Sequence, residues 1–233
     1  QPQLTGGPDH GGAAVAGDLE LIMATVLQHD LRVVEAGNGH RNGLVPRQRG
    51  DVPAALRELW EMRRIAPDAE APCLLAADLL MAADRGDDLK NLLGAMQAQP
   101  ALAKLVPLMQ AHWNLRRAGL SEAADALQQA DPELKRRAGF AITSAAVAWA
   151  QQDAPQAFEH LADSLEFTGA RGLVRNDFLK AFAAALQTAD PKTMSDRVEQ
   201  LLTKYPDEPV VLLASAEMAA RRGDVPAAME RID

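Results

Sequence analysis

The chain has 233 residues and carries 24 basic against 32 acidic side chains, a formal net charge of −8, so it offers no complementary charge to nucleic-acid backbones. Hydrophobic residues make up 48% and aromatic residues only 4%, a composition that suits stacked helices better than a sheet. The single cysteine, Cys73, excludes an intrachain disulfide, and no apolar run is long enough to span a bilayer.

The first 48 residues differ from the rest of the chain and form a separate N-terminal segment. Residues 1–12 contain several Gly and Pro residues, which predict a poorly ordered start. Residues 17–34 predict a helix with one apolar side, formed by Leu19, Ile22, Met23 and Val26. Residues 36–48 are rich in glycine and predict a loop.

The glycine-rich run 37–43 also raises the question of a phosphate site. A strand over residues 31–34 that led into this turn could present backbone N–H groups to a phosphate. Such a site needs a helix that opens directly after the glycines, and Pro46 and Gly50 interrupt it. We therefore favour a loop without a bound cofactor.

From residue 49 onward the sequence repeats itself. The heptapeptide of residues 50–56, GDVPAAL, returns at residues 223–229 as GDVPAAM. Weaker copies of its first two residues lie between them, at Gly86-Asp87, Gly119-Leu120, Gln152-Asp153 and Ala189-Asp190. The steps between the six anchors are 36, 33, 33, 37 and 34 residues, which predicts a recurring pair of helices.

The positions 11, 7 and 4 residues before each anchor share one helix face and predict the core. Fourteen of these fifteen residues are apolar: Leu75, Leu79, Ala82, Leu108, His112, Leu115, Ala141, Ala145, Ala148, Phe178, Phe182, Ala185, Leu212, Ala216 and Ala219. The exception, His112, is expected to make an interhelical contact through one ring nitrogen. The aspartates at the anchors are expected to cap helices: Asp51, Asp87, Asp153, Asp190 and Asp224.

This pattern, with a small residue at the bend between two helices, resembles the tetratricopeptide-repeat family over residues 49–233. The resemblance implies an all-α fold: a right-handed α-solenoid of about five to six antiparallel helical hairpins. It also implies a non-catalytic platform for protein–protein interaction. The chain lacks an initiator Met and stops at Ile232-Asp233 within a predicted helix, which indicates a piece of a longer protein.

In such a stack the first helix of each hairpin lines the concave face. Its middle part is expected to bind a partner through Met109, Trp113, Arg116, Ile142, Trp149, Leu179 and Leu186. This surface would accept an apolar peptide or an amphipathic helix. The same residues could instead be buried between hairpins, or be covered by the apolar residues 19–26, and the sequence leaves these alternatives open.

The sequence contains no pattern that predicts an enzyme or a metal site. None of the five histidines pairs at His-x-x-x-His spacing or lies near the cysteine at ligand spacing. We therefore expect an interaction scaffold in an assembly, secretion or envelope-biogenesis complex, without catalytic residues, cofactor or metal, and with possible self-association. The alternative is an accessory repeat domain of a larger enzyme such as a glycosyltransferase. The composition looks bacterial, and both periplasm and cytoplasm remain open.

Overall fold

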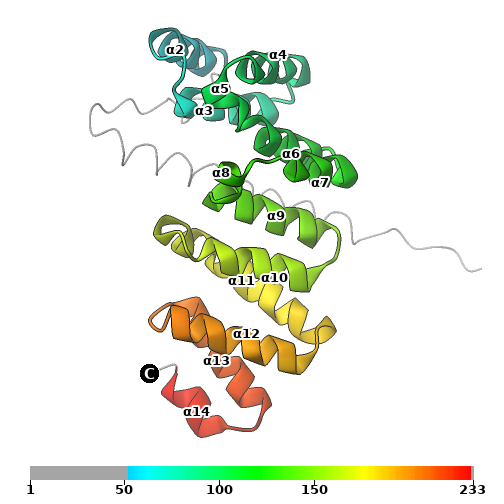
Figure 1. Ribbon diagram of the computed structural model, residues 1–233, viewed down its shortest axis with the longest axis vertical. Helices are drawn as coiled ribbons and strands as arrows, with labels where there is room; N and C mark the ends of the chain where they lie inside the picture. Colours follow the sequence, from blue (N-terminus) through cyan, green and yellow to red (C-terminus); the bar gives the residue numbers. More distant parts are fainter. Residues whose placement is uncertain (1–51, 232–233) are drawn as a thin grey trace, which may run out of the picture.

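The computed structural model describes residues 52–231, and all regular secondary structure in this range is α-helical (Figure 1). The helices are α2 (Val52–Ile65), α3 (Glu70–Ala82), α4 (Gly86–Gln97), α5 (Pro100–Ala103), α6 (Val106–Arg116), α7 (Leu120–Gln128), α8 (Pro132–Lys135), α9 (Ala138–Ala150), α10 (Ala154–Ser164), α11 (Thr168–Thr188), α12 (Pro191–Lys204), α13 (Pro209–Arg221) and α14 (Val225–Glu230). The predicted all-α class is confirmed. The predictions for residues 1–48 lie outside the described residues.

The helices form hairpins that follow one another along the long axis of the molecule (Figure 1). The pairs are α3–α4, α6–α7, α9–α10, α11–α12 and α13–α14, and we call their members the first and second helix. The first helices also contact one another in chain order, from α3 through α6, α9 and α11 to α13. The hairpins therefore present one continuous layer of first helices. Between residues 52 and 231, no helix has both the length and the hydropathy that crossing a bilayer requires.

Four of the five hairpins bend in the same way. Each bend contains one residue with a positive φ: Asp84 (52°), Ala118 (56°), Gln152 (63°) and Gly223 (80°). The next residue donates its N–H to the carbonyl five positions back, in the pairs Arg85–Leu80 (2.9 Å), Gly119–Asn114 (2.8 Å), Asp153–Ala148 (2.9 Å) and Asp224–Ala219 (3.0 Å). This left-handed cap satisfies carbonyls at the end of the first helix. The donor residue is at the same time the N-cap of the second helix.

The N-caps of the second helices give the structural alignment of the repeats. They are Arg85, Gly119, Asp153, Asp190 and Asp224, which lie 34, 34, 37 and 34 residues apart. The bend between α11 and α12 has an extended residue, Ala189, in place of a left-handed one. The recurrence predicted from the sequence is thus present in the backbone, with anchors displaced by up to one residue from the N-caps.

The displacement explains the errors of the core prediction in the first described hairpin. The sequence anchor Gly86 follows the N-cap Arg85, whereas the later anchors at 152, 189 and 223 precede their N-caps. Relative to the N-cap, the predicted core residues of α3 therefore lie two positions further along the chain than those of α9. They are wrong: Leu75 and Leu79 are only partly buried and Ala82 is exposed. Buried instead are Cys73, Ala77 and Leu80.

Gly86 serves close packing rather than the bend. A Cβ atom at this position would lie 3.0 Å from Cζ2 of Trp113, a side chain of the next hairpin. The absence of a side chain lets the N-terminus of α4 approach the indole ring. The bend itself is made two residues earlier, at Asp84.

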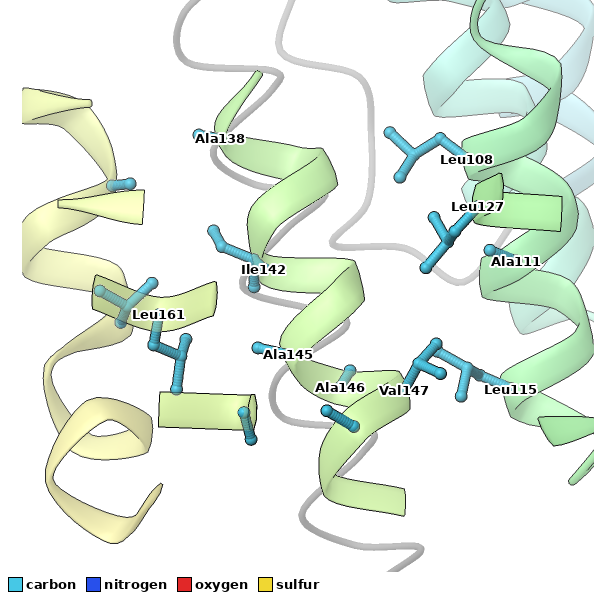
Figure 2. Packing of buried hydrophobic residues seen from close by; sticks show 14 of the residues in the cluster. Leu108, Ala111, Leu115, Leu127, Ala138, Ile142, Ala145, Ala146, Val147 and Leu161 are labelled. Carbon is cyan, nitrogen blue, oxygen red and sulfur yellow. The ribbon is translucent and has the colours of Figure 1, made fainter. Parts of the chain in front are cut away.

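One hydrophobic cluster extends through the stack, from Leu56 in α2 to Met218 in α13. Its middle is α9, which lies between α6 with Leu108, Ala111 and Leu115 and α10 with Leu161 (Figure 2). Every residue of α9 from Ala138 to Ala148 except Phe140 is buried. Further along, Phe158 of α10 packs its ring against Phe178 and Phe182 of α11, with centroids 5.1 and 5.6 Å apart. Small residues in α9 and aromatic rings beyond it join neighbouring hairpins.

Most of the remaining core prediction is confirmed. The predicted residues of α6, α9 and α11 are all buried, as are the last two of α13: Leu108, His112, Leu115, Ala141, Ala145, Ala148, Phe178, Phe182, Ala185, Ala216 and Ala219. Leu212 is only partly buried. In α2, Ala55 and Leu59 are buried, whereas Met62, at the same helical spacing, is 47% exposed.

Candidate functional site

The layer of first helices is the candidate binding surface, and the N-caps define which of its residues are equivalent. Residues 11, 7 and 4 positions before an N-cap lie on one side of a helix. They are Leu74, Asp78 and Met81 in α3; Leu108, His112 and Leu115 in α6; Ile142, Ala146 and Trp149 in α9; Leu179, Ala183 and Leu186 in α11; and Leu213, Glu217 and Ala220 in α13. We call this set the aligned face.

Exposure of the aligned face increases from α3 to α13. All three residues in α3 and in α6 are buried, as are Ile142 and Ala146 in α9. From Trp149 onward every member is half-buried or exposed. We call these accessible residues the open part: Trp149, Leu179, Ala183, Leu186, Leu213, Glu217 and Ala220. A partner can reach the aligned face over the end of α9 and over α11 and α13.

The structure brings four of the seven predicted binding residues onto the aligned face. Three of them, Trp149, Leu179 and Leu186, belong to its open part and pack against the edge of the core. The fourth, Ile142, is 1% exposed and lies inside the core. These four residues lie on neighbouring helices, α9 and α11, which contact each other.

The other three predicted residues lie elsewhere on α6. Met109, Trp113 and Arg116 precede the N-cap Gly119 by 10, 6 and 3 residues, so each is rotated by about 100° from the aligned face. Met109 is completely buried, Trp113 is half-buried against Gly86, and Arg116 is exposed. Leu213 and Glu217 lie outside the seven predicted binding residues, although the spacing before the anchor Gly223 assigns them to the same face of the first helix.

His112 makes the interhelical contact expected from the sequence. Its ring is 1% exposed, and Nε2 lies 2.6 Å from Oγ1 of Thr143 on α9. That hydroxyl donates its own hydrogen to the carbonyl of Gly139, at 2.7 Å. The hydroxyl oxygen therefore accepts from Nε2–H, which assigns a proton to this nitrogen. The histidine joins α6 to α9 as a structural side chain.

Three of the five expected aspartate caps are confirmed. The carboxylates of Asp153, Asp190 and Asp224 accept the backbone N–H three residues later, at 3.0, 2.8 and 3.2 Å. The hydrogen bonds from Thr193 also hold the pKa of Asp190 below its ordinary value. Asp87 lies in the first turn of α4, as expected of an acidic group at a helix N-terminus, but it is not the N-cap: that residue is Arg85, and the Asp87 carboxylate faces Lys90 at 3.8 Å. Asp51 lies outside the described residues.

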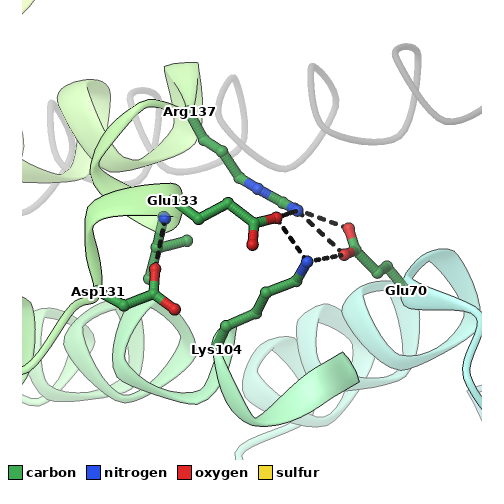
Figure 3. A network of polar contacts seen from close by, with 6 residues as sticks. Glu70, Lys104, Asp131, Glu133 and Arg137 are labelled. Carbon is green, nitrogen blue, oxygen red and sulfur yellow. Dashed lines mark hydrogen bonds and ion pairs between the residues drawn. The ribbon is translucent and has the colours of Figure 1, made fainter. Parts of the chain in front are cut away.

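Glu70 is part of a network of ion pairs (Figure 3). Arg137 donates to both its oxygens, at 2.7 and 3.0 Å, and Lys104 lies 3.5 Å away. Lys104 also donates to Glu133, at 2.7 Å. The bond from Arg137 lowers the pKa of Glu70, and the bond to Glu133 raises the pKa of Lys104. The network ties the N-terminal end of α3 to those of α6 and α9, which is a structural role.

The described residues contain no assembly suited to metal binding. Among residues 52–231, no three His, Cys, Asp or Glu side chains are grouped closely enough to hold an ion. Cys73 is buried in α3, and burial raises the pKa of its thiol, which lowers its reactivity. The aligned face therefore remains the candidate site, and its chemistry is that of apolar contact. In comparisons with known proteins, no family model matches this sequence and no curated protein is significantly similar to it.

Proposed function

We propose that the chain is a non-catalytic protein-interaction scaffold built as a right-handed, tetratricopeptide-like α-solenoid. Its partner binds with an apolar peptide or one side of an amphipathic helix on the open part of the aligned face. The observation that carries the proposal is the equivalence of Trp149, Leu179, Leu186 and Leu213. These apolar side chains occupy matching positions on three successive first helices and stay partly accessible.

The spacing within the open part suits a helical ligand. Leu179 and Leu186 lie two helical turns apart on α11, with Ala183 between them. A small residue between two leucines leaves room for a ligand side chain, and the leucines contact its flanks. Trp149 and Leu213 extend the same strip to the neighbouring helices. Aromatic and large apolar residues commonly supply most of the energy in such contacts.

Charged residues near the open part would orient the ligand. Glu217 is exposed on α13 and pairs with Arg221 at 2.8 Å, four residues further along. An exposed pair of this kind contributes little stability, so either member is available to a ligand at small cost. Arg116 is exposed on α6, outside the aligned face. The proposed setting is an assembly, secretion or envelope-biogenesis complex of a bacterium, in which such a platform brings partners together.

Affinity capture from the native organism, read out by quantitative mass spectrometry, tests this function. The baits are the full chain, a Leu179→Glu/Leu186→Glu variant, and a Met62→Glu control in which the altered side chain is 47% exposed on α2. A charge on the apolar strip must be desolvated when a partner binds, so partner recovery should fall by about tenfold or more. The control should recover the same partner as the unchanged chain. Equal recovery by all three baits would refute the proposed site.

A further inference from the structure

A basic residue extends the open part of the aligned face by one helical turn on α11. Arg175 precedes Leu179 by four residues, so the two side chains share one side of the helix. Arg175 is exposed, and no carboxylate of residues 52–231 pairs with it. The accessible strip along α11 thus consists of a positive charge followed by Leu179, Ala183 and Leu186. A complementary ligand has a carboxylate one turn before its apolar side chains.

The chain contains such a pattern in residues 17–34, which precede the described part. The sequence predicts a helix there, and its apolar side consists of Leu19, Ile22, Met23 and Val26. Asp18 precedes Ile22 by four residues and is therefore expected on the same side, one turn before the apolar residues. The segment has a carboxylate and apolar side chains in the order that the strip on α11 would accept.

The net charges of the segment and of α11 are opposite. Residues 17–34 contain three acidic side chains and one basic side chain, a net charge of −2. Three basic side chains and one acidic side chain give α11 a net charge of +2, whereas α3 has two acidic side chains and α9 has no charged one. Electrostatic attraction therefore favours α11 among these first helices as the place where the segment binds.

The connection between the segment and α2 is long enough for this contact. Residues 35–51 form the connection, and 17 residues span at most about 55 Å when extended. The helices α2, α3, α6, α9 and α11 contact one another in this order, which makes four steps (Figure 1). Packed helices lie about 8–10 Å apart, so α11 is about 40 Å from α2. The segment can therefore reach the open part of its own chain.

We propose that residues 17–34 bind the open part of the aligned face of their own chain. In this complex Asp18 pairs with Arg175, and the apolar side of the segment lies on Leu179 and Leu186. A partner that uses the same face must displace the segment, so its apparent affinity is reduced by the fraction of chains in which the segment is bound. This competition rests on the proposed function, whereas the binding of the segment does not.

NOE spectroscopy of the full chain, labelled with ¹³C at the Met and Leu methyl groups, tests the binding. We expect NOEs from the methyl group of Met23 to those of Leu179 and Leu186. Arg175→Glu should reduce their intensity by about threefold or more, because it replaces attraction to Asp18 by repulsion. Asp18→Arg in the same protein should restore them. Lys192→Glu, the same reversal of charge at an exposed position of α12, should leave them unchanged.

Three results would overturn the binding of the segment. The first is the absence of these NOEs in the unchanged chain. The second is NOEs from Met23 to Met62 of α2 in their place, because the segment would then cover α2. The third is a dimer whose sedimenting mass falls to that of one chain in Arg175→Glu, because the segment would then bind a second copy.

Partner capture tests the competition separately. The bait Asp18→Arg loses the attraction of the segment to Arg175 and should recover about threefold more partner than the unchanged chain, or better. Equal recovery by the two baits would refute the competition. The NOEs of Met23 decide whether the segment binds even where the partner uses another face, so failure of the proposed function and failure of this inference give different results.

Discussion

At the residue scale, the bends show that one backbone conformation is used with four different side chains. Gly223 has the residue type that the left-handed region favours and Asp84 one that it tolerates, whereas Ala118 and Gln152 adopt it at a cost. In all four bends the positive-φ residue donates its N–H to the carbonyl three positions back, and the next residue donates to the carbonyl five positions back. Geometry, rather than residue identity, is therefore the common element of the repeats.

Opposite substitutions at two equivalent bends should have opposite effects. Ala118→Gly is expected to stabilise the protein by roughly 0.5–1 kcal/mol, since it removes the strain of a left-handed alanine. Gly223→Ala is expected to destabilise it by about 1 kcal/mol, although a Cβ atom there would meet no neighbour within 4 Å. Urea unfolding of both variants measures these effects. The same sign for both would contradict the shared conformation.

The contact between Gly86 and Trp113 gives a second prediction at this scale. Gly86→Val should destabilise the protein by about 1–3 kcal/mol, because its side chain would enter the space of the indole. Trp113→Ala should also destabilise it, by roughly 2 kcal/mol, without loss of the captured partner. Thermal unfolding and partner recovery are measured on the same variants. Loss of the partner with unchanged stability would place Trp113 in the binding site instead.

At the scale of the helices, α9 shows why small residues recur in this chain. It contacts α6, α7, α10 and α11. Its buried alanines let these helices approach closely, so a larger side chain at one of these positions would meet a neighbouring helix. Ala145→Leu should therefore destabilise the protein by about 1–3 kcal/mol. The matched change Ala183→Leu, at an exposed position of α11, should stay within about 0.5 kcal/mol. Equal melting temperatures for the two variants would contradict the tight packing of α9.

The ion pairs of Glu70 predict a dependence on pH. The pKa of Glu70 is lowered in the folded protein, so its stabilisation is complete above the unfolded pKa and is lost as the pH falls through the folded value. Glu70→Gln should cost about 1–2 kcal/mol at pH 7 and less at pH 3. Urea unfolding of both proteins at the two pH values measures the difference. A cost that does not change with pH would show that charge is not involved.

The helix pairs could be predicted from the sequence because their period and their apolar positions are properties of single residues. The rotation of each helix about its axis could not, because it depends on which residue is the N-cap. Gly86 is a residue type typical of bends, but it lies inside α4. The N-cap is Arg85, whose side chain makes no capping hydrogen bond. One residue of displacement corresponds to about 100° of rotation. The anchors 152 and 189 both precede their N-caps by one residue, so Trp149 and Leu186 have equivalent positions. The anchor Gly119 is itself the N-cap, so Met109 and Trp113 are rotated away from them.

At the scale of the whole molecule, a single hydrophobic cluster joins the hairpins, and the first helices form one continuous layer. Burial along the aligned face divides this surface into a closed part over α3 and α6 and an open part from Trp149 to Ala220. The division confines the proposed binding to less than half of the stack. The ion-pair network of Glu70 lies at the closed part and connects its helices.

Hydrogen–deuterium exchange of the full chain with its captured partner tests the central claim most directly. The account predicts that binding slows exchange in the three segments that carry the open part, residues 142–149, 179–186 and 213–220. Exchange in the second helices α10 and α12 should stay unchanged, because the partner does not contact them. Protection of α10 and α12 without protection of α11 and α13 would contradict the claim that the first helices bind the partner.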